Sequence, residues 1–278
     1  DENGEPDILL YHRRDRNNFQ LVRFFRENET DVWQRDTFDI DEGLSNVNFI
    51  QIIDLEEDGE KDVIIGTPGF SFQNGLFYAK QQNGQFSGLD TLQRQPAKSS
   101  FYALEDFNRD GKVDLLLGSE AGLYYSLFSE EKMEWEAVQP IPVHMFRWNM
   151  EVGDMDRDGD RDILATSSRQ GFIAIIQNNQ AFDRIHVIES GLSQADRSFP
   201  MDLDQDGDQD FLYVKSSGFS DGGFWLYRND GAGKYAPELV DRELVGADYV
   251  RAVDLDGDED LDLVTASVFW TGIFYYMN

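Results

Sequence analysis

The nine residues 202–210 read DLDQDGDQD and place carboxylates at positions 1, 3, 5 and 9, with Gly207 at position 6. Alternate side chains of such a loop direct oxygen atoms toward one hard cation. A backbone carbonyl at position 7 adds a ligand, and the glycine allows a sharp turn. Without a cation, carboxylates this close together would repel one another. Calcium is the predicted occupant, because magnesium requires a tighter octahedron and retains its waters.

Four more copies of this nonapeptide occur along the chain, and we predict that all five bind calcium. In chain order, positions 1, 3, 5, 7 and 9 are Asp54, Glu56, Asp58, Glu60 and Asp62 in the first loop (54–62); Asp106, Asn108, Asp110, Lys112 and Asp114 in the second (106–114); Asp154, Asp156, Asp158, Asp160 and Asp162 in the third (154–162); Asp202, Asp204, Asp206, Asp208 and Asp210 in the fourth (202–210); and Asp254, Asp256, Asp258, Asp260 and Asp262 in the fifth (254–262). The N-terminal DENGEPD resembles a sixth, partial copy with Asp1, Asn3 and Asp7. The expected content is therefore about five calcium ions, with a sixth at the partial loop.

Variation within the copies indicates what each position does. Position 7 is Lys112 in the second loop, so the backbone carbonyl, and not the side chain, is the expected ligand there. Position 2 is always apolar and is expected to point into the protein. Position 6 is glycine except in the fifth loop, where Glu259 stands at position 6 and Gly257 at position 4. An EF-hand is excluded, because position 12 is never acidic and each loop runs into a short apolar segment typical of a strand.

The spacing of the loops predicts the architecture. First ligands at 54, 106, 154, 202 and 254 lie 52, 48, 48 and 52 residues apart, a period in the range of propeller blades. Each repeat contains four strand-like segments, of which the fourth is expected near GQFSGL (84–89) in one unit and near MEWEAV (133–138) in the next. The fold class is therefore an all-β propeller of four-stranded antiparallel blades.

A strand, a D-x-D-x-D-G-x-x-D loop, an apolar strand and a G-[FLI]-[FYW] hairpin together resemble the FG-GAP or VCBS repeat. The resemblance covers essentially residues 1–278, as one domain of about six blade repeats. Six second strands and six third strands can be counted, but only five first and five fourth strands. We favour six blades from a longer native chain, and a seven-bladed ring would need roughly seventy more residues at this period.

Composition restricts the class of partner and the compartment. The formal net charge is −30, which argues against nucleic acid or an anionic membrane as a partner. The chain contains no cysteine and no apolar stretch long enough to span a membrane as a helix. Weak calcium sites in several copies suit an extracellular or periplasmic setting, including the cell surface, where calcium is millimolar.

Catalytic motifs are absent from the sequence, so a non-catalytic role in recognition or adhesion is the expected function. His12, His144 and His186 are the only histidines, and no G-x-S-x-G, H-E-x-x-H or P-loop pattern occurs. The resemblance implies adhesion or recognition modules, lectins, or appendages of polysaccharide-degrading enzymes. The alternative is accordingly the propeller portion of a carbohydrate-active enzyme, either a lyase or a hydrolase.

The expected partner is a glycan or an extracellular protein, bound on the face opposite the calcium loops. In a four-stranded blade the connections between second and third strands lie on that face. These connections carry arginine and aromatic residues that could capture carboxylates or stack on sugar rings. The candidates are Arg13, Arg14, Arg16, Phe70, Phe72, Arg169, Phe219 and Trp270. The competing interpretation is that the aromatic residues pack between blades.

Overall fold

The structure is a computed structural model in which several connections are left undescribed. It describes residues 8–13, 18–26, 33–42, 44, 47, 49–67, 75–94, 99–119, 122–129, 131–132, 134–143, 148–167, 169–192, 195–215, 223–242, 247–267 and 272–278. The chain divides into two compact units, one comprising 1–102 with 129–135 and the other 103–128 with 136–278. Within the described ranges, no helix is long and apolar enough to cross a membrane.

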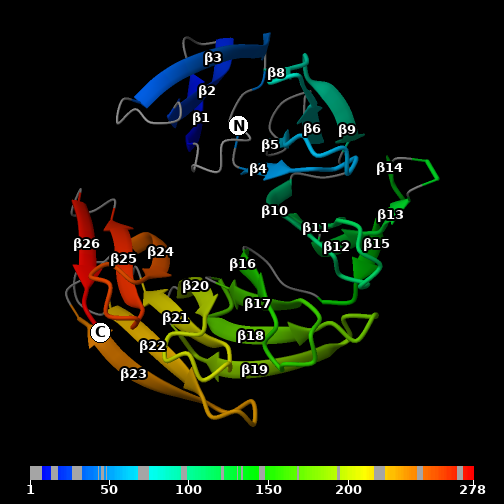
Figure 1. Cartoon of the computed structure of the whole chain (residues 1–278). Helices are drawn as coiled ribbons and strands as arrows, with labels where there is room; N and C mark the ends of the chain where they lie inside the picture. The colour runs from blue at the N-terminus through cyan, green and yellow to red at the C-terminus, as the bar shows by residue number, and fades with distance from the viewer. Residues whose placement is uncertain are drawn as a thin grey trace. The chain divides into compact units, whose positions relative to one another are not determined.

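The chain has an all-β, six-bladed propeller fold whose blades are small antiparallel sheets (Figure 1). In chain order the blade sheets are β1 (Ile8–Arg13), β2 (Asn18–Arg26) and β3 (Trp33–Glu42); β4 (Phe49–Ile53), β5 (Asp62–Thr67), β6 (Gly75–Ala79) and β9 (Asp90–Arg94); β10 (Ser99–Glu105), β11 (Asp114–Ser119), β12 (Gly122–Ser126) and β15 (Gln139–Ile141); β16 (Trp148–Gly153), β17 (Asp162–Ser167), β18 (Phe172–Gln177) and β19 (Arg184–Ser190); β20 (Ala195–Met201), β21 (Asp210–Lys215), β22 (Gly223–Asn229) and β23 (Tyr235–Asp241); and β24 (Ala247–Val253), β25 (Asp262–Ser267) and β26 (Gly272–Tyr276). The first and last sheets have three strands, so the counted deficit of one first and one fourth strand is confirmed.

The second strand of each complete blade is the most buried element. All six residues of β5, β11 and β17 are buried, because such a strand is flanked by strands on both edges and covered on both faces. Burial on two faces explains why these segments read as continuous apolar runs and do not alternate. Each of them begins at position 9 of a loop, as do β21 and β25, so these second strands hold the five described loops at one end of their blades.

Apolar clusters between neighbouring sheets fix the blades of each unit against one another. Met155 and Ile175 of one sheet pack in the same cluster as Phe211, Tyr213 and Tyr227 of the next. Phe199, Leu203 and Phe224 likewise share a cluster with Val250 and Leu263. In the N-terminal unit, Leu21 and Phe38 pack with Val63, Ile65 and Phe77.

The position 2 side chain of a loop belongs to this packing between blades. Phe107, Met155 and Leu203 are buried, as predicted. The prediction is wrong for Leu255, which is 47% exposed. The reason is that Leu255 belongs to the last blade sheet, and no following sheet of its unit covers it.

Two fourth strands lie further along the chain than expected. The residues around GQFSGL form a small hairpin, β7 (Gln81–Gln82) with β8 (Gln85–Phe86), and the blade is completed by β9. Those around MEWEAV contribute to a second small hairpin, β13 (Phe128–Ser129) with β14 (Glu134–Trp135), and β15 completes that blade. Outer strands are half-exposed and polar, so their apolar pattern does not distinguish them from an added hairpin.

Candidate metal-binding loops

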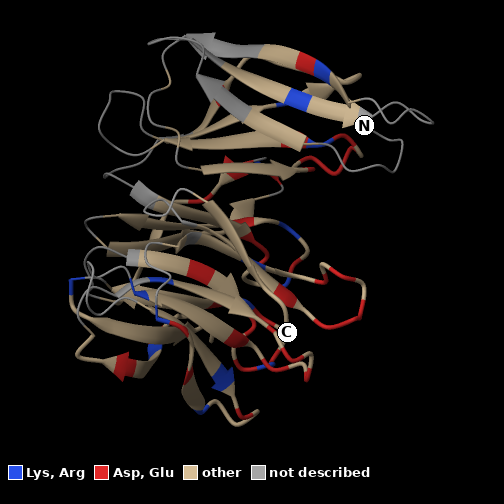
Figure 2. Ribbon diagram, turned by 90° about the vertical axis from the view of Figure 1, so that its left-hand side faces the viewer, with Lys and Arg blue, Asp and Glu red and all other residues tan. Residues whose placement is uncertain are grey.

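The five loops occupy equivalent places, each between the first and second strands of a blade sheet. In Figure 2 the acidic colouring gathers on the loops around the label C, at one end of the strands. Loops that align in the sequence therefore lie at the same place in their blades.

Side-chain oxygens at positions 1 and 5 shape the backbone of the loop. The carboxylate of Asp106 accepts hydrogen bonds from the amides of Asp110 (3.1 Å) and Gly111 (2.8 Å), and Asp54 does the same for Asp58 and Gly59 at 3.0 Å each. Position 5 then accepts from the amide of position 7 in every loop, at 2.8–3.0 Å. These are Asx-type turns, and they explain why aspartate is favoured over glutamate at these positions.

Positions 4 and 6 are left-handed in all five loops. Position 6 has φ of 85–92° at its four glycines and 77° at Glu259. Position 4 has φ of 56–62° at its four non-glycine residues and 82° at Gly257. The fifth loop thus keeps the backbone shape although its glycine has moved by two residues. A non-glycine residue costs about 1 kcal/mol in this conformation, and each loop has one such residue.

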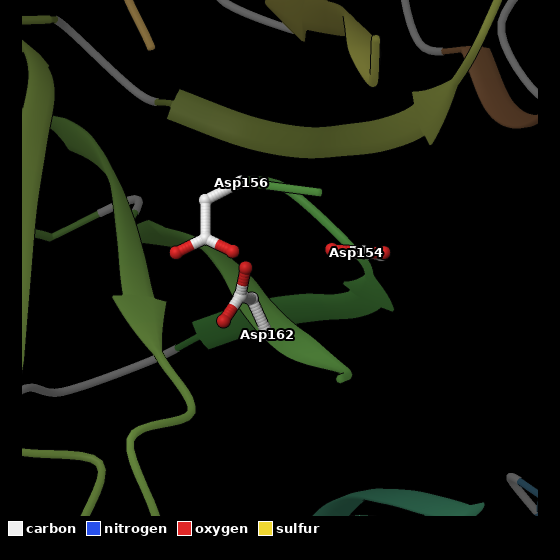
Figure 3. Close-up of side chains that lie close together, drawn as sticks. All are labelled: Asp154, Asp156 and Asp162. Carbon is white, nitrogen blue, oxygen red and sulfur yellow. The ribbon is translucent and has the colours of Figure 1, made fainter. Parts of the chain in front are cut away.

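Carboxylates converge in three of the loops. The triads are Asp154, Asp156 and Asp162; Asp202, Asp204 and Asp206; and Asp254, Asp256 and Asp262, each with ligand atoms within 4.8 Å of one another. Figure 3 shows the first triad, with the carboxylates of Asp156 and Asp162 turned toward one another. Oxygen atoms at this spacing suit a hard divalent cation.

Unpartnered oxygen atoms support the fit to a cation. Asp154 Oδ1, Asp202 Oδ1 and Asp210 Oδ2 are buried and have no hydrogen-bond partner among the described residues. A buried carboxylate oxygen without a partner is costly, and coordination to a metal ion removes that cost. The donor set consists of oxygen atoms alone, which is the preference of calcium.

Burial and mutual repulsion raise the pKa values of the carboxyl groups in these loops. Burial raises the pKa of Asp162 to about 7, and the nearby charge of Asp156 adds to the increase, against hydrogen bonds from the backbone. Burial also raises the pKa of Asp114 and of Asp210 to about 6. A bound divalent cation would favour the ionised forms and reverse these shifts.

Position 9 has a structural role that the sequence did not reveal. Asp162 accepts from the amide of Met155 at position 2 (3.0 Å) and from the amide of Asn178 after the third strand (2.7 Å). The bond to the third strand recurs in all five loops, with donor amides at Gln81, Phe128, Asn178, Asn229 and Asn278. Position 9 thus ties the loop to the blade, and only its remaining electron pairs are available to a metal.

Other side chains contact the carboxylates of the first and second loops, as Gln177 does in the third loop and Arg228 in the fourth. Lys80 forms ion pairs with Glu56 and with Asp58, the second at 3.1 Å. In the second loop the amide of Asn108 donates to Asp110 Oδ2 at 2.8 Å. No triad is found among the described residues of these two loops. The prediction of about five ions therefore has geometric support in the third, fourth and fifth loops.

Side chains at position 4 connect each loop of the C-terminal unit to the next. Arg109 donates to the carbonyl of Asp158 (2.6 Å), and Gln205 donates to the carbonyl of Glu259 (2.7 Å). Arg157 donates through Nε to the Gly207 carbonyl (2.6 Å) and through Nη2 to the Asp206 carbonyl (2.8 Å), and its Nη1 lies 2.6 Å from Asp208 Oδ1. These contacts link neighbouring predicted metal sites, and sequence reasoning missed them.

Most residues predicted for recognition cannot be placed. The recognition candidates Arg14, Arg16, Phe70, Phe72, Phe219 and Trp270 lie outside the described residues, as do His144 and the predicted metal ligands of the partial loop, Asp1, Asn3 and Asp7. Arg13 is the last residue of β1, and Arg169 lies in the β17–β18 connection, at the end of its sheet opposite the third loop. The structure therefore does not bring the predicted recognition residues together or separate them.

Comparison with known proteins places this geometry in a known repeat type. A family model described as an FG-GAP-like repeat matches residues 106–165, which contain the second and third loops, and 202–265, which contain the fourth and fifth. These two stretches are thus FG-GAP-like repeats within a six-bladed β-propeller. No curated protein matches it.

Two solved structures resemble the whole chain or much of it. One concerns the specific recognition of non-reducing terminal N-acetylglucosamine by an Agrocybe aegerita lectin, with 15% identity, a TM-score of 0.64, and coverage of 93% of this chain and 74% of that one. The other is the V. cholerae biofilm matrix protein Bap1, with 19% identity, a TM-score of 0.43, and coverage of 81% of this chain and 35% of that one. At such identities, the likeness to the lectin establishes the fold alone.

Proposed function

We propose that this protein is a calcium-stabilised, non-catalytic recognition module that binds glycans outside the cytoplasm. The observation that carries the calcium assignment is the set of buried carboxylate oxygens without partners, which lie in loops whose side chains converge. The glycan assignment is supported by a lectin with the same fold across 93% of the chain. Several loops of moderate affinity suit an extracellular or periplasmic compartment with millimolar calcium.

Calcium has a structural role in this proposal. In the third loop it would be held by Asp154, Asp156, Asp158 and Asp162, with the position 7 carbonyl of Asp160. It would supply positive charge that offsets the repulsion between these carboxylates. The loop then joins the first and second strands of the blade, and position 9 also ties it to the end of the third strand.

Calcium removal tests the metal assignment. A loop saturated at 100 times its dissociation constant adds about 2.7 kcal/mol to the folded state, so several loops together should raise the melting temperature strongly. We expect a large fall in melting temperature when EGTA is added to the calcium-loaded protein. An unchanged melt would overturn the calcium assignment.

A pair of variants separates metal ligands from other loop residues. Asp256→Ala removes an exposed carboxylate from the fifth triad, and Lys112→Ala alters a position at which only the backbone carbonyl is expected to coordinate. The first change should lower the calcium stoichiometry by one ion, measured by equilibrium dialysis and elemental analysis. The second should leave the stoichiometry unchanged, and equal effects would contradict the alignment of the loops.

A glycan array probed in millimolar calcium tests the recognition function. We expect binding to at least one class of glycan, and the absence of any glycan binding would overturn the proposal. The face opposite the loops remains the predicted surface for a partner. Trp270→Ala should weaken a ligand bound there by about 1–3 kcal/mol without changing calcium content.

A further inference from the structure

A cavity of about 360 Å³ opens between two blade sheets of the C-terminal unit, on the side of the metal loops. Its walls come from the third and fourth loops, from Gln177 at the end of β18, from His186 within β19, and from the β22–β23 hairpin. These two sheets are neighbours in Figure 1. Met155, the position 2 residue of the third loop, also lines the cavity.

The hairpins of the two sheets can be aligned residue by residue. The amides of Asn178 and Asn229 both donate to Oδ1 of the position 9 aspartate, which fixes the alignment. Two and four residues later, both hairpins have left-handed residues: Gln180 (φ 68°) and Phe182 (φ 50°) in one, Gly231 (φ 74°) and Gly233 (φ 77°) in the other. Phe182 therefore corresponds to Gly233.

Phe182 closes the equivalent space one blade earlier. It is 2% exposed, and its ring lies 5.9 Å from the ring of Phe107 and 5.6 Å from that of Tyr125. Phe107 is the position 2 residue of the second loop, as Met155 is of the third. At Gly233 an added Cβ would meet no atom within 4 Å. At this next junction the Tyr235 hydroxyl donates to the Met155 carbonyl at 3.4 Å, but the space beside Gly233 that a phenyl ring could occupy is open.

The polar groups around the cavity indicate the kind of ligand it could accept. The guanidinium of Arg157 is committed to the fourth loop through Nε, Nη1 and Nη2. The amide nitrogen of Gln177 donates to Asp156 Oδ2 at 2.6 Å. His186 lines the cavity, and its imidazole can exchange hydrogen bonds with a hydroxyl group. An anion would meet the carboxylates of Asp156 and Asp208 without an uncommitted guanidinium or ammonium group.

We propose that this cavity, left open by Gly233, binds one terminal residue of an uncharged glycan. The inference rests on the proposed recognition function and adds a site on the metal-loop side, separate from the predicted opposite face. A volume of about 360 Å³ lies at the lower end of the range for ligand pockets, roughly 300–1,000 Å³, which suits one sugar residue and not a longer chain. Hydroxyl groups can both donate to the carboxylates and bond to the imidazole.

The test uses the calcium-loaded protein and ligand-observed NMR with the methyl glycosides of glucose, galactose, mannose, N-acetylglucosamine and glucuronic acid. At least one neutral glycoside should bind, and the glucuronide should not. Gly233→Phe should then weaken the bound glycoside at least tenfold with unchanged calcium content, since Phe182 shows that this backbone conformation accepts phenylalanine. The matched control is Gly84→Phe in the β7–β8 turn. Gly84 also has a positive φ (72°) and open space around an added Cβ, so this variant should bind the glycoside as the wild type does.

The outcomes distinguish the two proposals. If the wild type binds no glycoside and no array glycan, the recognition function fails. If glycan binding is intact in Gly233→Phe, or if the glucuronide binds best, the assignment of the cavity is overturned while the recognition function stands. If Gly233→Phe does not fold, the imidazole signals of His186 provide the test. They must shift when the bound glycoside is titrated into the wild type, and signals that do not move overturn the assignment.

Discussion

Removing the ring of Phe182 tests whether a phenyl group closes the junction between two blades. Phe182 is 2% exposed and packs against Phe107 and Tyr125, so truncation to alanine leaves a cavity in a well-packed region. Substitutions of this type cost about 3–5 kcal/mol. The backbone adds a second expectation, because Phe182 has φ of 50°, a conformation that costs an alanine about 1 kcal/mol and a glycine nothing. Phe182→Gly should therefore be no less stable than Phe182→Ala, which reverses the usual order.

Urea denaturation in saturating calcium gives the free energies of unfolding that this comparison needs. Ile185→Ala on β19 of the same blade is the control. Because Ile185 is 45% exposed, its truncation should lower the free energy of unfolding much less than the Phe182 substitutions do. If Phe182→Ala lowered the free energy of unfolding by less than about 1 kcal/mol, the Phe182 ring would not fill the space between the two blades. A glycine variant less stable than the alanine variant by about 1 kcal/mol would refute the left-handed conformation at this residue.

Two further expectations concern the metal loops. Burial raises the pKa of Asp162 to about 7 from an ordinary value of 3.8, so the metal-free fold should lose stability as pH rises from about 4 to 7. The increase in melting temperature caused by calcium should therefore be smaller at pH 5.5 than at pH 7.5. An equal calcium effect at both pH values would contradict this linkage. Arg157→Met keeps the aliphatic stem but removes three contacts to the fourth loop, so calorimetry should show one calcium site weakened by about 5–150-fold, corresponding to 1–3 kcal/mol. Arg184→Met, the same change of charge at an exposed position of β19, should leave all sites unchanged.

The sequence predicts the blades well wherever a residue has a role that repeats. Aspartates at fixed spacing locate the loops, and the apolar run after each loop locates the second strand. The fourth strands around residues 84–89 and 133–138 were placed wrongly, because a polar outer strand and a polar extra hairpin have the same composition. Leu255 was also predicted wrongly. Leu255 occupies the same loop position as the buried residues Phe107 and Met155. It is exposed because no further sheet of its unit follows the last blade sheet.

Roles that depend on a distant partner could not be predicted from the pattern. Asp162 looks like one metal ligand among several, yet it also binds the amide of Asn178, sixteen residues away. Arg157 occupies a position that varies between Glu57, Arg109 and Gln205, so nothing in the repeat marks it as a bridge to the next loop. Such contacts become visible only when the left-handed backbone at position 4 fixes the direction of the side chain.

The repeated loop and strand residues therefore account for the fold. Residues that differ between repeats account for the differences between one blade junction and another. Phe182 and Gly233 occupy the same left-handed position in equivalent hairpins, and the ring of Phe182 is buried at one junction whereas a cavity lies beside Gly233 at the next. Acidic residues recur at most ligand positions of the five loops, whereas the hairpin residue is Phe182 in one blade and Gly233 in the next. A β-propeller can thus acquire a pocket at one junction without weakening the loops that hold the blades, because the metal ligands and the hairpin position belong to different parts of the repeat.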